Sequence, residues 1–207
     1  HPQGEEVGVV WQLNEWRFKA PKLARLLNGK TRVIQSGGNL GLYPKLLSNL
    51  FSEVITLEPV TSYYRYLVEN TKTCTNIKSF NKGVSDKPGK AEICDIEQGN
   101  CGHTVLQETE SGSIEMVAID DLGFSEIDLL WLDVEGYEDK ALLGAKNTIE
   151  RDSPLLIIEN NGQCFSFPFI PDHEPSLELR QWVCDTFKYE YVDHIGGDDF
   201  FVKDKQW

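Results

Sequence analysis

Continuous apolar segments alternate with amphipathic helical patterns along most of this chain, and this alternation constrains the fold more than any other feature. The apolar segments lie at 31–36, 53–59, 76–86, 127–136 and 154–161. The helical patterns lie at 39–51, 61–72, 137–152 and 175–188. Strands that are apolar on both faces are typical of a parallel sheet covered by helices on both sides. The sequence therefore predicts an α/β fold with a mostly parallel sheet.

The same pattern divides the chain into a short leader and one domain. Residues 1–30 form a helical leader, which ends at Asn28-Gly29, a typical helix C-cap. Residues 31–207 show no linker, internal repeat or low-complexity tract, so we expect a single domain there. Within it, 90–119 predicts a β-hairpin or a lid, and 189–203 predicts an antiparallel hairpin around two adjacent glycines.

The charge and the cysteines bear on partners and location. The formal net charge is −13, and an acidic surface repels phosphate backbones, because nucleic-acid affinity comes largely from lysine and arginine. No apolar run approaches the roughly 20 residues that span a bilayer. The five cysteines form no C-x-x-C pair, which fits free thiols in a reducing cytoplasm. We therefore expect a cytoplasmic protein that binds neither nucleic acid nor membrane, and the sequence indicates no oligomeric state.

A glycine-rich turn, SGGNLG, joins the first predicted strand to the first predicted helix. Ligands bind outside the carboxyl ends of the strands in open parallel sheets, so this turn is the first candidate site. The dinucleotide pattern G-x-G-x-x-G fits incompletely, because Ser36 occupies its first position. The S-adenosylmethionine (SAM) pattern, acidic-x-G-x-G-x-G, retains two of three glycines, and its middle glycine is replaced by asparagine, which tolerates unusual backbone angles. The candidate cofactor residues of this turn are Gln35, Ser36, Gly37, Gly38, Asn39 and Gly41.

Further cofactor candidates follow the next two predicted strands. Glu58 ends the second strand, where a carboxylate can accept both ribose hydroxyls of an adenosine. The alternative for Glu58 is a solvated or helix-capping role. Asn81 and Gly83 follow the third strand and are expected to line the adenine, where a glycine lets a flat base approach the backbone.

Five segments, in this order, resemble the FkbM family of class I SAM-dependent methyltransferases: VIQSGGNLGLYP, ITLEP, NKGVSD, IDLLWLDVEGYEDKALLGA and PLLIIE. The resemblance covers residues 31–160, and LDVEGYEDKALLGA is its most specific element. It implies a Rossmann-like seven-stranded sheet and O-methylation of a hydroxyl, often on a sugar or a polyketide-type molecule. The chain departs from the family at Gln35, where members usually carry an aspartate. We therefore expect weaker SAM binding than with the acid, and tighter binding in a Gln35→Asp variant.

Carboxylates after the fourth predicted strand are the first catalytic candidates. Asp133 and Glu135 alternate along an extended segment, so both can project into one cleft, and Asp133 also lies next to the expected cofactor. A poorly acidic hydroxyl benefits from a general base, and two nearby carboxylates raise one pKa, which suits that role. Glu135 has an alternative role as the cap of the following helix.

Glu159 and Asn160 end the next strand and, with Asp133, offer three oxygen ligands of the kind that Mg²⁺ prefers. Catechol-type O-methyltransferases have a similar arrangement, but they carry a lysine three residues after the first aspartate, where this chain has Gly136. Hydrogen bonding of Glu159 and Asn160 to the substrate is therefore favoured over Mg²⁺, and we expect no metal.

Histidines are few, and one of them is a further catalytic candidate. His103, in a glycine-bounded segment, is the alternative general base, whereas His173 and His194 are interpreted as exposed loop residues. Aromatic side chains with a spacing of two follow the fifth predicted strand, and they either stack on a sugar ring or pack the loop against the sheet: Phe165, Phe167 and Phe169.

Two functions from different classes stay open. The first is a SAM-dependent O-methyltransferase acting on a hydroxyl of a small polar acceptor, a saccharide or glycan above all. The alternative is a catalytically inactive SAM-binding fold that acts as an interaction module, which Gln35 favours. A nicotinamide dehydrogenase is disfavoured by Ser36 and by the absence of a Tyr-x-x-x-Lys pair. N-methylation of nucleic acid is disfavoured by the charge and by the absence of an Asn/Asp-Pro-Pro-Tyr/Phe motif.

Overall fold

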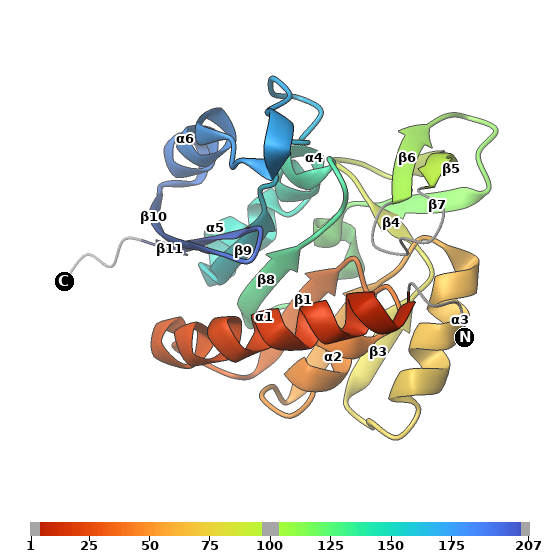
Figure 1. Cartoon of the computed structure of the whole chain (residues 1–207), viewed down its shortest axis with the longest axis horizontal. Helices are drawn as coiled ribbons and strands as arrows, with labels where there is room; N and C mark the ends of the chain where they lie inside the picture. Colours follow the sequence, from red (N-terminus) through yellow and green to blue (C-terminus); the bar gives the residue numbers. More distant parts are fainter. Residues whose placement is uncertain (1–4, 97–103, 204–207) are drawn as a thin grey trace.

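The computed structural model describes residues 5–96 and 104–203, and its larger sheet has seven strands in the order β10-β11-β9-β8-β1-β2-β3. The strands are β1 (Arg32–Ser36), β2 (Glu53–Leu57), β3 (Ile77–Phe80), β8 (Ile127–Leu132), β9 (Leu155–Glu159), β10 (Tyr189–Ile195) and β11 (Asp198–Lys203). β1 pairs in parallel with β2 and β8, whereas β11 is antiparallel to both β9 and β10. The predicted mostly parallel sheet with a terminal antiparallel hairpin is confirmed (Figure 1).

Helices cover both faces of this sheet. They are α1 (Glu5–Leu26), α2 (Leu42–Leu47), α3 (Thr61–Thr71), α4 (Glu138–Leu143), α5 (Lys146–Asp152) and α6 (Leu177–Phe187). Successive strand residues point to opposite faces. Leu129 and Trp131 of β8 therefore share a core with α1 and α2, whereas Leu130 and Leu132 pack with α4, α5 and α6. This two-sided burial explains why the central strands are apolar throughout.

Helix α1 lies across one face of the sheet (Figure 1). Leu23 is fully buried in the same core as Val33 and Trp131. Lys19, on the same helix, is 2% exposed although it carries a charge. The predicted leader thus shares a hydrophobic core with the sheet. Among the described residues, the helices include none long and apolar enough to cross a bilayer.

A second, four-stranded sheet has the order β4-β7-β5-β6. Its strands are β4 (Gly83–Val84), β5 (Gly89–Ile96), β6 (Thr104–Glu108) and β7 (Ile114–Val117). The single strand predicted over 76–86 is therefore wrong, because β3 and β4 belong to different sheets. At the break, Asn81 Nδ2 donates to the carbonyl oxygens of Glu58 (2.8 Å) and Pro59 (3.0 Å), which holds the chain at the end of β2.

The single helix predicted over 137–152 is also wrong, because it consists of α4 and α5. The carbonyl oxygen of Gly144 accepts from the backbone N–H of Asp120 (2.8 Å) outside the helix. The Asp120 carboxylate then accepts from the backbone N–H of Thr148 (2.8 Å), in the first turn of α5. A Cβ at Gly144 would lie 2.1 Å from the carbonyl oxygen of Ser85. Contacts with segments distant in the sequence therefore interrupt the helix at Gly144.

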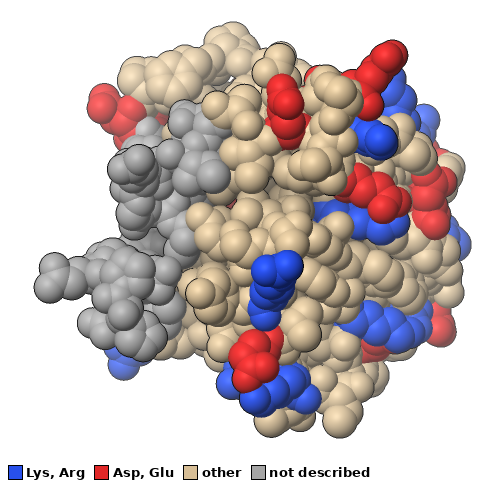
Figure 2. Space-filling model, turned by 90° about the vertical axis from the view of Figure 1, so that its right-hand side faces the viewer, with Lys and Arg blue, Asp and Glu red and all other residues tan. Residues whose placement is uncertain are grey.

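Acidic and basic side chains are interspersed over the face that Figure 2 shows. Ion pairs of this kind join Lys78 to Glu53 and Lys82 to Glu115, each with an N–O distance of 2.5 Å. Exposed pairs contribute at most about 1 kcal/mol each. The expectation that nucleic acid is not a partner stays a prediction.

Candidate active site

A cavity of about 930 Å³ lies at the carboxyl ends of the parallel strands. Its walls come from α1, the turn after β1, the ends of β2, β8 and β9, the small sheet and the β10–β11 turn. Ligand pockets in proteins typically measure roughly 300–1,000 Å³, so this cavity has room for a large ligand. The predicted site residues that line it are Ser36, Gly37, Asn39, Glu58, Gly83, Asp133, Glu135 and Glu159.

The glycine turn packs directly on the end of β8. Gly37 has φ 89°, and a Cβ there would lie 1.9 Å from the carbonyl oxygen of Asp133, so only glycine fits. Asn39 has φ 46°, an unusual backbone angle of the kind that asparagine tolerates better than most residues. The turn thereby brings its backbone beside Asp133 at the cavity wall.

Gln35, the position that departs from the family pattern, is not among the residues lining the cavity. Its side chain is 1% exposed and lies beneath the turn. Its amide nitrogen donates to the carbonyl oxygens of Ser36 (3.2 Å) and Gly37 (2.9 Å), and its amide oxygen accepts from Thr56 Oγ1 (2.7 Å). Gln35 therefore braces the turn from below, a role that an ionised aspartate could not perform because it has no proton to donate.

Three other cofactor candidates support the fold around the cavity instead of lining it. A Cβ at Gly38 would lie 2.4 Å from Leu67 Cδ1, so this glycine lets α3 pack closely. Gly41, with φ 91°, precedes α2 and approaches the Leu67 backbone. Asn81 donates two hydrogen bonds to the loop after β2, and its amide oxygen accepts a third from Thr61 Oγ1. None of the three is among the described residues that line the cavity.

Glu58 is 4% exposed and lines the cavity at the end of β2. Its Oε2 accepts from the backbone N–H of Asn39 (2.7 Å), and its Oε1 accepts from that of Val60 (2.8 Å). Burial raises the pKa of Glu58 to about 7. A carboxylate offers about four acceptor sites, so each oxygen can still accept one hydroxyl from a ligand.

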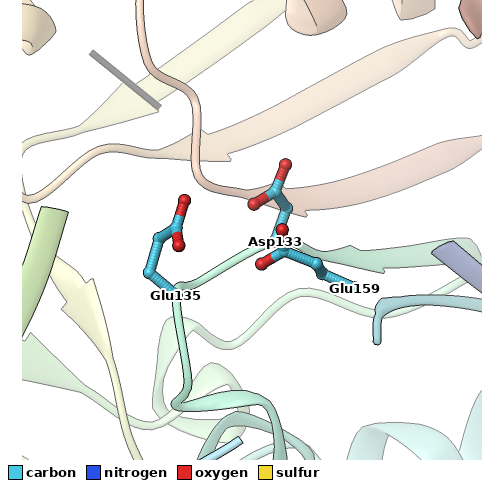
Figure 3. A group of neighbouring side chains, drawn as sticks. All are labelled: Asp133, Glu135 and Glu159. Atoms are coloured by element: carbon cyan, nitrogen blue, oxygen red, sulfur yellow. The ribbon is translucent and has the colours of Figure 1, made fainter. Parts of the chain in front are cut away.

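Three carboxylates gather at the ends of β8 and β9. Asp133, Glu135 and Glu159 each offer an oxygen within 4.8 Å of the others. Figure 3 shows Asp133 and Glu159 close together and Glu135 directed toward the same space. The sequence predicted that these residues share one cleft, and the structure brings them together.

Burial dominates the electrostatics of this cluster. Burial, reinforced by the charge of Asp198, raises the pKa of Asp133 to about 7, although Lys19 opposes the shift. Burial, followed by the charges of Asp133 and Glu135, raises the pKa of Glu159 well above its ordinary value. Asp133 and Glu159 also present oxygens within 4.8 Å of each other. Two carboxyl groups this close disfavour ionisation of both at once.

The N-cap of α4 is Tyr137 rather than Glu135, and it makes no side-chain cap hydrogen bond, whereas Glu138 binds the turn before the helix. Glu138 Oε1 accepts from the backbone N–H groups of Val134 (3.1 Å) and Gly136 (3.2 Å). Glu135 and Gly136 both have positive φ, at 51° and 97°. A left-handed conformation is uncommon for a glutamate, and here it belongs to the turn that carries Glu135 into the cavity wall.

Asn160 does not reach the cavity beside Glu159. It is 2% exposed, and its amide nitrogen donates to the Ser176 carbonyl oxygen (3.0 Å) and to Asp199 Oδ2 (2.7 Å). The carboxylate and Asp-Asn arrangement of catechol-type enzymes is therefore not reproduced. In the described part of the chain, the residues that could hold a metal are the three clustered carboxylates. The expected absence of a metal stays a prediction.

A buried charged cluster from α1 was not predicted. Lys19 Nζ lies 2.9 Å from Glu15 Oε2 and 2.8 Å from Asp198 Oδ2. It also lies 5.4 Å from the ring centroids of Tyr43 and Trp131, within cation–π range. Burial opposes the charge of Lys19, but Asp198, Tyr43 and Glu15 raise its pKa above the ordinary value. The one sequence signal was the i, i+4 spacing of Glu15 and Lys19.

The histidines differ from their predicted roles. His103, the alternative base, lies outside the described residues. His173 ends a short 3₁₀ helix (Pro171–His173). His194, interpreted as an exposed loop residue, instead lines the cavity, and its Nδ1 lies 2.8 Å from Asp199 Oδ1.

The three phenylalanines after β9 differ in exposure and packing, and the predicted stacking on a sugar ring stays a prediction. Phe167 packs against the Trp182 ring with a centroid distance of 5.9 Å. Phe165 and Phe169 are 57% and 71% exposed and line a smaller hollow of about 400 Å³. Gln163 lines both this hollow and the large cavity, so the two spaces adjoin.

The sheet order and the helices on both of its faces are those of the class I SAM-dependent methyltransferase fold. The family model described as "Methyltransferase FkbM domain" matches residues 14–189, most of the chain. The protein therefore belongs to the FkbM methyltransferase family.

Solved structures with the same fold are distant in sequence. The FkbM methyltransferase from Methylobacillus flagellatus KT has a TM-score of 0.57 at 18% identity, over 83% of this chain and 43% of that one. The present chain thus spans less than half of that protein. The methyltransferase domain of bacterial CtHen1 has a TM-score of 0.54 at 15% identity, over 92% and 99% of the two chains. The N-methyltransferase NodS from Bradyrhizobium japonicum WM9 has a TM-score of 0.52 at 10% identity, over 94% and 96%. No curated protein matches the chain in sequence.

Proposed function

We propose that this chain is a SAM-dependent O-methyltransferase that acts on a hydroxyl of a small polar acceptor, a saccharide or glycan. One observation carries the proposal. A single cavity runs from Glu58, a buried carboxylate held by two backbone N–H groups at the end of β2, to three clustered carboxylates at the ends of β8 and β9. The first end suits an adenosine ribose, and the second suits a molecule with several hydroxyls.

The residues of the first end fit the cofactor. Glu58 is fixed by the backbone N–H groups of Asn39 and Val60 and keeps acceptor capacity for two ribose hydroxyls. Gly37 and Gly83 expose backbone to the same cavity, which allows close approach of a ligand. SAM supplies an already activated methyl group, so the protein has to align the acceptor and exclude water.

The residues of the second end suit a neutral acceptor rich in hydroxyls. Asp133, Glu135 and Glu159 are half-buried and able to accept hydrogen bonds from hydroxyl groups, and the partial exclusion of water strengthens such bonds. The same carboxylates repel a phosphorylated or carboxylated acceptor. The acceptor hydroxyl has to lose its proton during transfer, and a base at this end of the cavity supports that step.

The alternative, an inactive SAM-binding fold, rested on Gln35. Because this side chain braces the turn and is not among the cavity-lining residues, its lack of charge does not argue for a site without activity. A cytoplasmic location also stays part of the proposal. It is supported by the free cysteines of the described chain, which are Cys74, Cys94, Cys164 and Cys184.

An assay of methyl transfer to a panel of methyl glycosides, measured as the release of S-adenosylhomocysteine (SAH), tests the proposal. We expect turnover by the wild type. In Glu135→Gln, a carboxylate that accepts hydrogen bonds from hydroxyl groups becomes an amide, and we expect the rate of methyl transfer to fall about ten-fold or more. The control Glu174→Gln changes an exposed glutamate that is not among the cavity-lining residues, and we expect it to behave as the wild type. SAH binding without turnover of any glycoside would favour the inactive interaction module instead.

A further inference from the structure

We infer that His194, held in place by Asp199, is the general base that takes the proton from the acceptor hydroxyl. This inference rests on the proposed methyl transfer. It assigns a role to a histidine that the carboxylate cluster does not include.

The β10–β11 hairpin positions the pair. Gly196 and Gly197 both have positive φ, 58° and 83°, as the two-residue turn of a hairpin requires. The residues on either side pair in register, so His194 lies directly opposite Asp199. His194 Nδ1 is 2.8 Å from Asp199 Oδ1, and His194 is among the residues that line the large cavity.

Asp199 is built as a hydrogen-bond acceptor. It is fully buried, and Arg180 donates to both of its oxygens, from Nε to Oδ2 (3.0 Å) and from Nη2 to Oδ1 (2.7 Å). Asn160 donates a further bond to Oδ2 (2.7 Å). The guanidinium balances the charge of the carboxylate, so the buried site is electrically neutral.

An acceptor at this position fixes the tautomer of the imidazole. Asp199 accepts a hydrogen bond, so Nδ1 must carry the proton that is donated to it. In the neutral imidazole, the other ring nitrogen, Nε2, is then unprotonated. Nε2 of this cavity-lining residue then holds a lone pair, on the edge of the ring away from Asp199. The same carboxylate–imidazole logic orients the base in enzymes that activate a serine hydroxyl.

The clustered carboxylates have a different role. Their oxygens lie within 4.8 Å of one another, which suits hydrogen bonds to several hydroxyls of one acceptor. They therefore orient the acceptor, while His194 removes its proton. The acceptor O–H bond breaks and the proton moves to Nε2 of His194. The oxygen lone pair forms the new bond to the methyl carbon, whose bond to sulfur breaks with the electron pair staying on sulfur.

The tautomer of His194 is measurable without an acceptor. Nitrogen-15 imidazole spectra of the whole chain at about pH 8.5, above the ordinary histidine range, report which ring nitrogen carries the proton. The chain has four histidines, and the signal lost in His194→Gln assigns the residue. We expect the Nδ1–H tautomer in the wild type. The Nε2–H tautomer, or rapid exchange between the two, would overturn the inference.

The catalytic role is tested by SAH release with a mixture of methyl glycosides as acceptors. We expect His194→Gln to lower the rate about 100-fold or more with unchanged affinity for SAH, and added imidazole to restore part of the rate in His194→Ala. Glu190→Gln, which changes an exposed residue of the same strand, serves as the control. A rate within three-fold of the wild type in His194→Gln, or no rescue by imidazole, would overturn the role of His194 alone. No SAH release by the wild type would overturn the proposed function together with it.

Discussion

Replacement of Gln35 by glutamate tests whether this side chain braces the glycine turn. Glutamate keeps the shape of glutamine but exchanges the donating amide group for an oxygen. That group donates to two backbone carbonyls, of Ser36 at 3.2 Å and Gly37 at 2.9 Å. In Gln35→Glu, these carbonyls lose their donor and face a buried carboxylate.

The expected cost follows from these contacts. Each lost hydrogen bond contributes about 1 kcal/mol, and a buried group left without its partner adds further cost. We therefore expect Gln35→Glu to lower the free energy of unfolding by roughly 2–4 kcal/mol. SAH binding should also weaken, because the turn that faces the ligand loses its support. This expectation differs from the effect of charge that the sequence alone predicted for Gln35→Asp.

Urea denaturation followed by tryptophan fluorescence, with calorimetric titration of SAH, measures both effects. The fully buried Trp131 makes fluorescence sensitive to unfolding of the core. The exposed Gln107→Glu is the matched control, and it should change the free energy of unfolding by less than about 0.5 kcal/mol. Unchanged stability together with tighter SAH binding in Gln35→Glu would refute the bracing role. It would mean that position 35 acts on the ligand through its charge.

Two further predictions concern buried charge. Lys19→Met leaves Glu15 and Asp198 buried without their cation, so we expect the free energy of unfolding, measured by urea denaturation, to fall by about 3–5 kcal/mol. The control Lys22→Met breaks a more exposed ion pair and should lower it by less than about 1 kcal/mol. Equal losses in the two variants would contradict this prediction. Burial raises the pKa of Asp133 to about 7, so its stabilising protonated form is lost as pH rises through that value. The free energy of unfolding should then fall by at least about 1 kcal/mol between about pH 5 and pH 8. Asp133→Asn should reduce this fall, and an identical pH dependence in that variant would show that Asp133 is not its source.

Most of the fold could be predicted because local patterns and tertiary packing agree. The strand that ends at Asp133 is apolar on both faces and packs between two helical layers, so periodicity alone identifies it. The two wrong predictions, a single strand over 76–86 and a single helix over 137–152, lie where contacts with distant segments determine the local structure. The break at Gly144 depends on hydrogen bonds to the Asp120 segment, and the break between β3 and β4 depends on bonds from Asn81 to the loop after β2.

The candidate site could be predicted only in part, for related reasons. Glu58 and Asp133 follow strands, and parallel strands place their carboxyl ends together. The direction of the Gln35 side chain depends on its rotamer and on Thr56 of the next strand, which sequence spacing does not reveal. Lys19 enters the site because α1 packs on the sheet, a long-range contact. His194 had a usable signal, because a two-residue Gly-Gly turn sets it opposite Asp199.

Calorimetric titration of SAH into the wild type and Glu58→Gln tests the central claim most directly. The substitution keeps the size of the side chain but removes acceptor capacity at the position proposed to bind the ribose. Glu110→Gln, at an exposed position that is not among those lining the cavity, is the control. We predict micromolar binding that weakens at least ten-fold in Glu58→Gln, about 1.4 kcal/mol, and is unchanged in Glu110→Gln. Absence of SAH binding to the folded wild type would contradict the assignment of this cavity to SAM.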